Sequence, residues 1–278
     1  MYYLPTVGPV IGGVMYEFLG YKSPFLLIAG LAVVDGVLRL LQQRPAEEES
    51  KEKADDYSSL NLLKDPYVLL AAAFLFVGTA ASVMVGGMVP VWMMMSMNAS
   101  AWQQGVSALP AAGGFIIGTF LSSMLVGRTG RWLLILVGIL GLGVSMAIIP
   151  LARNIPELIT PYLAFGIFSG LAETTVLTEI GELADTRHGS KYGSAFAISE
   201  SAMCIGITIG LAVSGVLMDA LGFFWMMLGL GLLNVLLSPA AILLRNVPST
   251  EKMDKLTIVY KEENQLKTQF YKPQPGED

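Results

Sequence analysis

The sequence predicts an all-α membrane protein with several spanning helices. Of its 278 residues, 54% are hydrophobic and only 14% are charged, whereas soluble domains carry roughly 25% charged residues. Many of the charges fall in the segments 42–65 and 245–278. Between these segments lie apolar runs of about the 20 residues that a helix needs to cross a bilayer.

Seven apolar runs are candidates for spanning helices. Residues 1–19 resemble the end of an eighth, and because Met1 precedes neither a basic region nor a cleavage site, we do not expect a signal peptide. Because residues 1–19 resemble only the last part of a spanning helix, we expect that the chain lacks N-terminal helices. The seven runs are Pro24–Leu41, Pro66–Met95, Gly105–Val126, Trp132–Leu151, Leu158–Leu183, Ser194–Leu217 and Phe223–Leu244.

The polar segment 42–65 divides the chain into two unequal groups of helices. Transporters built from two helical halves have this layout. We therefore expect 1–41 to be the end of an N-terminal bundle, with its last one to two helices, and 42–65 to be a cytoplasmic linker. Residues 66–244 are expected to form a C-terminal six-helix bundle, followed by a cytoplasmic tail at 245–278.

The distribution of lysine and arginine predicts the orientation. When successive loops are assigned to alternate sides, fourteen basic residues fall on one side and only Lys22 and Arg153 on the other; Arg39 lies inside a helix. Basic residues concentrate in cytoplasmic loops, so the linker and the tail are expected to be cytoplasmic. The loop that contains Asn98-Ala99-Ser100, a glycosylation sequon, then lies on the luminal side, where glycosylation occurs.

Several functional classes are excluded or disfavoured. The composition excludes a soluble enzyme, a nucleic-acid binder and a secreted disulfide scaffold. A zinc site needs three or four converging ligands, but the chain has one cysteine, Cys204, and one histidine, His188. We expect no metal, no cofactor and no enzymatic activity, since the chain also lacks a P-loop and a G-x-S-x-G motif.

Pairs of small residues recur at four-residue spacing within the apolar runs. This spacing places both glycines on one face and lets helices approach closely. Ordinary helix packing is the favoured interpretation, although such faces also let the helices of a transporter slide. The pairs are Gly8/Gly12, Gly114/Gly118, Gly166/Gly170 and Gly206/Gly210.

Specific stretches of the chain resemble one transporter family. Gly8, Pro9, Gly12 and Gly13 are similar to the end of the antiporter signature of major facilitator proton antiporters. Over most of its length the chain resembles the vesicular amine transporters, the monoamine and acetylcholine carriers of secretory vesicles. The stretches that carry this resemblance are GGVMYEFLGYKSPFLL, LLKDPYVLLAA, VPVWMM, TGRWLL, DTRHGSKYGSAFAISESA and LLRNVPS.

The resemblance implies a major facilitator fold and a proton-coupled antiporter. Such carriers exchange luminal protons for cytoplasmic cationic amines at a vesicle membrane. In this chain Glu173 and Glu200 stand where the family has intramembrane aspartates. Other positions depart from the family: Gly86-Gly87 replaces Glu-Pro, Ile207 replaces a tyrosine, and Gly127 replaces an aspartate.

Glu173 and Glu200 are also singled out by physical reasoning. Glu173 lies about 22 Å into the Leu158–Leu183 run, near mid-membrane, where a charge costs at least about 2.5 kcal/mol. A carboxyl group persists there only if it is paired, protonated or open to a water-filled cavity. Glu200 lies about 9 Å from the edge of its run, and we expect it to be wetter. Both are candidates for proton coupling and substrate binding.

Further charges are candidates for a gate or for solvated ion pairs. Glu179, Glu182 and Asp185 follow each other at three-residue steps, roughly on one helix face, with Arg128, Arg131, Arg187 and Lys191 as candidate partners. Asp35 and Arg39 are four residues apart, the spacing of an ion pair within a helix.

Two alternatives to the amine antiporter stay open. The chain is either a major facilitator carrier for another small solute, which the missing acid at Gly86-Gly87 would explain, or a transport-inactive membrane protein that acts by binding partners.

Overall fold

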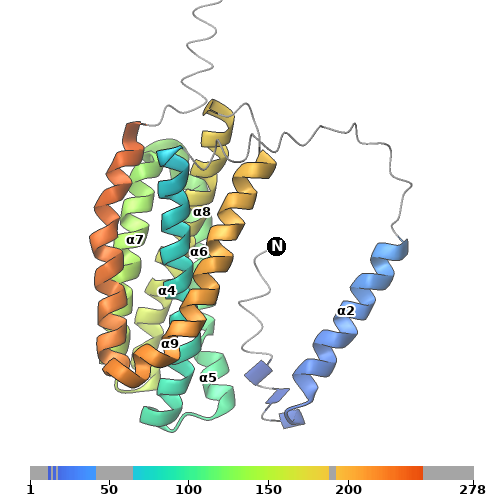
Figure 1. Ribbon diagram of the computed structural model, residues 1–278. Coiled ribbons are helices and arrows are strands. Elements are labelled where there is room, and N and C mark those ends of the chain that lie inside the picture. Colours follow the sequence, from blue (N-terminus) through green and yellow to red (C-terminus); the bar gives the residue numbers. More distant parts are fainter. Residues whose placement is uncertain (1–11, 14, 17, 42–64, 188–191, 247–278) are drawn as a thin grey trace, which may run out of the picture.

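The computed structural model describes residues 12–13, 15–16, 18–41, 65–187 and 192–246 (Figure 1). Every regular element in these ranges is helical, which confirms the predicted all-α class. Helices α4, α6, α7, α8 and α9 run side by side in one bundle, and α2 lies beside it. The elements are α2 (Ser23–Leu41), α4 (Pro66–Met97), α5 (Ala101–Ser107), α6 (Leu109–Thr129), α7 (Arg131–Ile148), η1 (Ile149–Leu151), α8 (Ile155–Arg187), α9 (Tyr192–Leu237) and η2 (Ser238–Asn246).

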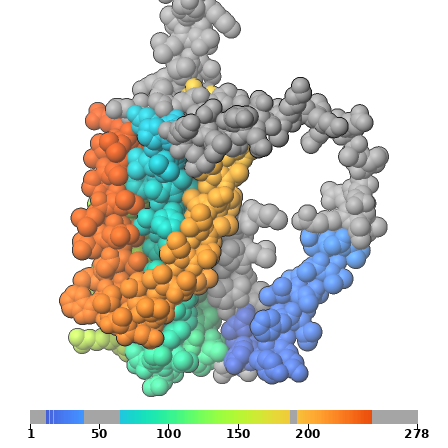
Figure 2. All heavy atoms as spheres, viewed as in Figure 1, coloured from blue at the N-terminus to red at the C-terminus, as the bar shows by residue number. Residues whose placement is uncertain are grey.

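The surface of the bundle is apolar. Phe120, Leu236 and Trp225 are each more than 60% exposed, and many other large hydrophobic side chains are exposed with them. Within the described residues, five helical stretches are, by length and composition, long and apolar enough to cross a membrane. The space-filling view in Figure 2 shows α4 and α9 side by side on one face of the bundle, where α9 crosses in front of α4. An apolar outer surface of this extent is suited to lipid rather than to water.

The ends of α4 are set by local chemistry. At its start, Asp65 accepts a hydrogen bond from the Tyr67 amide over 3.0 Å, and Pro66 occupies the first position, where no amide hydrogen is needed. At its end, Asn98 adopts the left-handed conformation, with φ 50° and ψ 36°, which terminates the helix. The predicted helix over 66–95 is confirmed, and it continues to Met97.

The predicted helix over 105–126 is wrong at its start. The Ser100 amide donates to Gln103 Oε1 over 2.9 Å, so helical structure begins at Ala101 as the short helix α5. Pro110 cannot donate a backbone hydrogen bond, and the chain therefore breaks at Ala108 before α6 begins.

The two last predicted helices form one continuous helical run interrupted by a single residue. Gly222 has φ 78° and ψ 161°, a conformation that side chains with a Cβ rarely adopt, and it reverses the chain direction. Figure 1 shows the first part of α9 descending along the bundle and the second part returning beside α7. Trp92 of α4 stacks on Phe223 at this turn, with ring centroids 4.5 Å apart.

The predicted small-residue faces pack against each other. A Cβ on Gly118 of α6 would collide with the Ile167 carbonyl of α8, and a Cβ on Gly170 of α8 would collide with the Phe115 carbonyl of α6. Gly114 and Gly166 make the matching contacts. These glycines bring the backbones of α6 and α8 into contact. In the same way, Gly206 and Gly210 of α9 lie against the backbone of α4 at Phe76 and Ala80.

Candidate functional site

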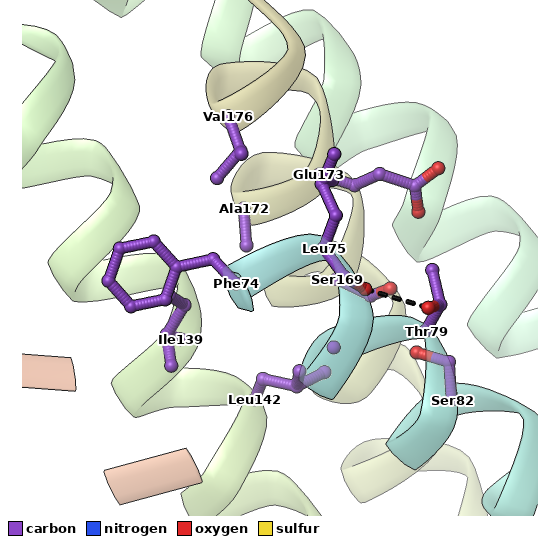
Figure 3. A pocket seen from close by; sticks show the side chains of 11 residues that line it. Phe74, Leu75, Thr79, Ser82, Ile139, Leu142, Ser169, Ala172, Glu173 and Val176 are labelled. Carbon is purple, nitrogen blue, oxygen red and sulfur yellow. Dashed lines mark hydrogen bonds between the residues drawn. The ribbon is translucent and has the colours of Figure 1, made fainter. Parts of the chain in front are cut away.

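Glu173 lies near the middle of α8. It is 18 residues from Ile155 and 14 from Arg187, or about 27 Å and 21 Å along the axis. Its side chain is half-buried and lines a small pocket between α4, α7 and α8 (Figure 3). The pocket is lined by Phe74, Leu75, Gly78, Thr79, Ser82, Ile139, Leu142, Ser169, Ala172, Glu173 and Val176.

This pocket has a polar side and an apolar side. The carboxyl group of Glu173 and the hydroxyl groups of Thr79 and Ser82 lie on one side, opposite the rings and aliphatic chains of Phe74 and Ile139 (Figure 3). The Thr79 hydroxyl donates to the Leu75 carbonyl over 2.7 Å. The space measures about 20 Å³ for the centre of a water-sized sphere, which is room for about one water molecule. The pocket is therefore too small, in this arrangement, to hold a solute larger than about one water molecule.

The structure brings together the two carboxylates that the sequence singles out. Glu200 of α9 is exposed, as its place near the edge of its helix predicts. Its charge acts on Glu173 although 26 residues separate them in the chain. Two acidic groups on facing helices can in principle share one positive charge or exchange protons.

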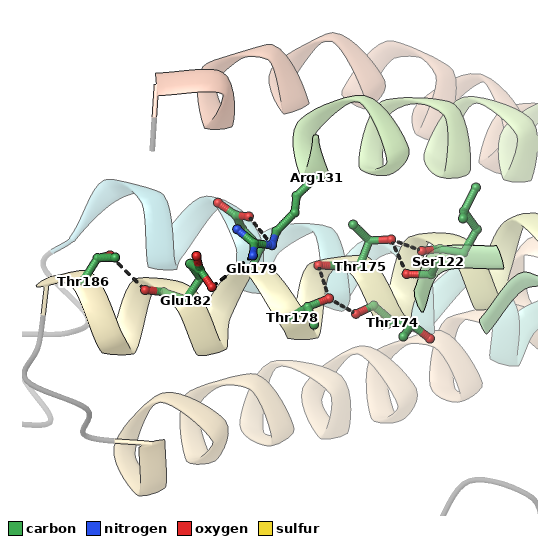
Figure 4. Close-up of polar contacts among 9 residues, drawn as sticks. Ser122, Arg131, Thr174, Thr175, Thr178, Glu179, Glu182 and Thr186 are labelled. Carbon is green, nitrogen blue, oxygen red and sulfur yellow. Dashed lines mark hydrogen bonds and ion pairs between the residues drawn. The ribbon is translucent and has the colours of Figure 1, made fainter. Parts of the chain in front are cut away.

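Arg131 is shared by two glutamates at one end of the bundle. Its Nη2 lies 3.0 Å from Glu182 Oε2, and its Nε lies 3.9 Å from Glu179 Oε2 (Figure 4). Glu179 is only 3% exposed, whereas the Glu182 side chain is 15% exposed. The expected pairing of Glu179 and Glu182 with a basic residue is thus found, and Arg131 contacts both.

The other candidate charges are only partly brought into this cluster. Asp185 accepts a hydrogen bond from the Tyr192 hydroxyl. Arg128 is exposed at the end of α6 and makes no ion pair within the described part of the chain. The side chain of Arg187 and the whole of Lys191 lie outside the described residues.

The N-terminal candidates are described only in part. Gly8 and Pro9 lie outside the described residues. Gly13 approaches α5 so closely that a Cβ on it would lie 2.8 Å from the Ala101 carbonyl oxygen, whereas a Cβ on Gly12 would meet nothing within 4 Å. On α2, Asp35 is exposed, and the side chain of Arg39 lies outside the described residues, so their ion pair stays a prediction.

A line of hydroxyl groups between α6 and α8 was not identified from the sequence. Ser122 and Thr175 hydroxyls lie 2.8 Å apart in a buried position, and Thr174 donates to Thr119 over 3.3 Å (Figure 4). The sequence does contain an indication of these contacts, namely serine and threonine residues in an otherwise apolar helix near Glu173. Single threonines also satisfy their own helix backbone, so only the structure identifies the contacts between helices.

Two further expectations concern metal ions and glycosylation. Among the described residues, no three His, Cys, Asp or Glu side chains gather as metal ligands. Cys204 is exposed, and His188 lies outside the described residues.

Asn98 is exposed at the end of α4, while the Ser100 hydroxyl of its sequon is buried. Glycosylation of Asn98 stays a prediction.

Comparison with known proteins yields one family and a consistent group of relatives. Residues 3–190 match the model of the Major Facilitator Superfamily. The chain is 40% identical over 270 residues to the chromaffin granule amine transporter of Rattus norvegicus, covering 96% of this chain and 51% of that protein. It is 37% identical over 265 residues to the synaptic vesicular amine transporter of Homo sapiens, covering 95% and 51%.

The vesicular acetylcholine transporter of Tetronarce californica is more distant. It is 33% identical over 244 residues, covering 87% of this chain and 47% of that protein. The chain spans about half the length of the relatives it matches. These relatives are transporters and not enzymes, in agreement with the sequence prediction.

Proposed function

We propose, from the premise that the chain belongs to the major facilitator superfamily, that it moves a small cationic amine into secretory or synaptic vesicles in exchange for protons. The similarity to chromaffin granule and synaptic vesicular amine transporters supports the amine as substrate class. Lipid surrounds the bundle in this proposal, with 42–65 and 245–278 on the cytoplasmic side.

The observation that carries the proposal is the position of Glu173. It lies near mid-helix in α8, beside a small pocket, and the sequence has no basic residue between Leu158 and Leu183. Its negative charge in this environment needs a proton or a cation from outside its own helix. A proton and an ammonium group neutralise the same charge and therefore compete for it, which is the basis of exchange.

Glu200 extends this site toward water. Because its charge acts on Glu173, binding a cation at one carboxylate lowers the repulsion felt by the other. The exposed position of Glu200 suits entry of protons or substrate, and the half-buried position of Glu173 suits retention. Both glutamates take part in coupling in this proposal, and Glu173 carries the larger share.

The test compares glutamine variants that mimic the protonated carboxyl groups permanently. Glu173→Gln should abolish amine accumulation that is driven by a fixed pH gradient, and Glu200→Gln should abolish or weaken it. Glu157→Gln is the matched control, since Glu157 lies on the same helix but is exposed and accepts a hydrogen bond from the Arg153 amide. Accumulation of labelled amine is measured in vesicles and normalised to protein abundance.

The outcomes separate this proposal from its alternatives. Accumulation by Glu173→Gln at the parental level would make Glu173 structural and refute the coupling assignment. The open positions Gly86 and Gly87, where a Cβ would meet nothing within 4 Å, favour a second candidate, a carrier for another small solute. Uptake of other solutes but not of amines by the parent would support it. The absence of any uptake would instead favour a partner-binding protein.

A further inference from the structure

Three polar side chains that line the Glu173 pocket have no hydrogen-bond partner within the described part of the chain. They are the carboxyl group of Glu173 and the hydroxyl groups of Ser82 and Ser169. Other buried serines of the bundle donate to a carbonyl four residues earlier, as Ser145 and Ser199 do. Ser169 is only 9% exposed, and a buried hydroxyl is costly unless it is hydrogen-bonded. These three groups are therefore available to a ligand.

The three groups reach the pocket from two helices. Ser169 and Glu173 are four residues apart on α8, which places them on one face and one turn from each other. Ser82 belongs to α4 and lines the same pocket (Figure 3). The space between the helices has room for about one water molecule. A ligand group that fits must therefore be about as large as water.

The ammonium group of a primary amine matches this pocket in size and in chemistry. It is a compact positive charge with three N–H donors and no acceptor. The pocket offers the carboxylate of Glu173 and two hydroxyl oxygens as acceptors, and a hydrogen bond between charged groups is the stronger kind. A calcium ion would need six to eight oxygen ligands. The three side chains together carry only four oxygens.

A quaternary ammonium group does not match. It has no N–H donor, and its methyl groups make it several times larger than the space available. Such groups are bound by several aromatic rings that form a cage. Among the residues that line this pocket, Phe74 is the one aromatic residue.

We propose that this pocket is the headgroup site for a primary amine and that it excludes quaternary ammonium ions. The inference rests on the amine exchange proposed above and adds which headgroup is accepted. Only the ammonium group enters the pocket, and the carbon skeleton of the amine stays outside. The walls that set the size are the aliphatic side chains opposite the carboxyl group, including Ile139 and Val176.

A binding experiment with two probes tests the headgroup. Phenethylamine and its N,N,N-trimethyl derivative share one skeleton and differ only in the ammonium group. Each is titrated calorimetrically into the full chain in lipid nanodiscs, without a pH gradient. Phenethylamine should bind at least about tenfold more tightly, because the trimethyl probe loses its hydrogen bonds to the pocket.

Two serine variants test the hydroxyl contacts. Ser82→Ala and Ser169→Ala should each weaken binding of phenethylamine about tenfold, which corresponds to one lost hydrogen bond to a charged group. Neither should change binding of the trimethyl probe. Ser96→Ala is the matched control on α4, because the exposed Ser96 hydroxyl donates to the Trp92 carbonyl. Unchanged binding of phenethylamine in both serine variants would overturn the assignment of the site.

A variant of the wall tests exclusion by size. Val176→Ala removes two methyl groups from the pocket and should narrow the preference for phenethylamine about tenfold. Val89→Ala is the matched control, since Val89 is equally buried but does not line the pocket. An unchanged preference in Val176→Ala would overturn exclusion by size. If this variant does not fold, the two probes and the serine variants still decide the headgroup.

The parent chain separates this inference from the proposed function. Equal affinity for the two probes, or tighter binding of the trimethyl probe, would overturn the headgroup assignment and leave amine exchange standing. Binding of neither probe would refute the amine as substrate class, and the headgroup site with it.

Discussion

Ser122 on α6 and Thr175 on α8 share a buried hydrogen bond of 2.8 Å between their hydroxyl oxygens. The Thr175 hydroxyl donates to the Leu171 carbonyl, so the Ser122 hydroxyl supplies the hydrogen of the contact between helices. Thr175 lies two residues after Glu173 on the same helix. The bond therefore fixes how α8 is rotated about its own axis relative to α6. This rotation also sets the direction in which the Glu173 side chain points.

A double-mutant cycle should measure this bond. We expect Ser122→Ala and Thr175→Val each to destabilise the folded protein, with a coupling energy of about 0.6 kcal/mol, the average for hydrogen bonds between membrane helices. The measurement is the free energy of unfolding in a denaturing detergent. Ser123→Ala is the control, because the exposed Ser123 hydroxyl donates within its own helix, to Thr119. A coupling no larger than that of Ser123 with Thr175 would contradict the prediction.

The close approach of α6 and α8 should make Gly118 intolerant of a side chain. Gly118→Ala places a methyl group against the Ile167 carbonyl and forces the helices apart. We expect a clear loss of thermal stability in detergent. Gly113→Ala is the matched control on the same helix, since its Cβ meets nothing within 4 Å. Equal melting temperatures for the two variants would show that the contact at Gly118 is not close.

The turn within α9 should depend on Gly222 because of its backbone conformation and not because of steric crowding. A Cβ there would meet nothing within 4 Å, but its φ of 78° and ψ of 161° are accessible to glycine almost alone. Gly222→Ala should therefore lower the free energy of unfolding by about 1–3 kcal/mol. Gly229→Ala also enters open space but in a helical conformation, and it should cause little change. Equal stabilities would mean that the turn relaxes without cost.

The orientation in the membrane can be tested with epitope tags. Tags in 42–65 should be accessible to protease on the outside of intact vesicles, and a tag at Asn98 should be protected until detergent is added. The reason is the excess of basic residues on the linker side. A tag in 245–278 serves as an internal control, because it is predicted to lie on the same side as 42–65. Digestion of the Asn98 tag in intact vesicles would reverse the topology.

Much of the fold follows directly from the sequence. Long apolar runs predict spanning helices because the backbone must satisfy its own hydrogen bonds in lipid. The helix ends at Pro66 and Asn98 follow local capping chemistry, as does the break at Gly222. The start at Ala101 and the break at Ala108 were missed, since a single side-chain hydrogen bond and one proline decide them and neither changes the hydrophobic pattern.

For the candidate site too, some features follow from the sequence and others are decided by the tertiary structure. Glu173 is identified by sequence alone, because a carboxyl group in a long apolar helix is costly wherever that helix packs. Its proximity to Glu200 and the choice of Arg131 over Arg128 as the partner of Glu179 and Glu182 are decided by tertiary structure. Hydrophobic periodicity and helix length depend on neighbours along the chain, whereas an ion pair depends on how two helices are rotated about their axes. That rotation is determined by the glycine contacts and hydroxyl bonds between helices, which form only in the packed bundle.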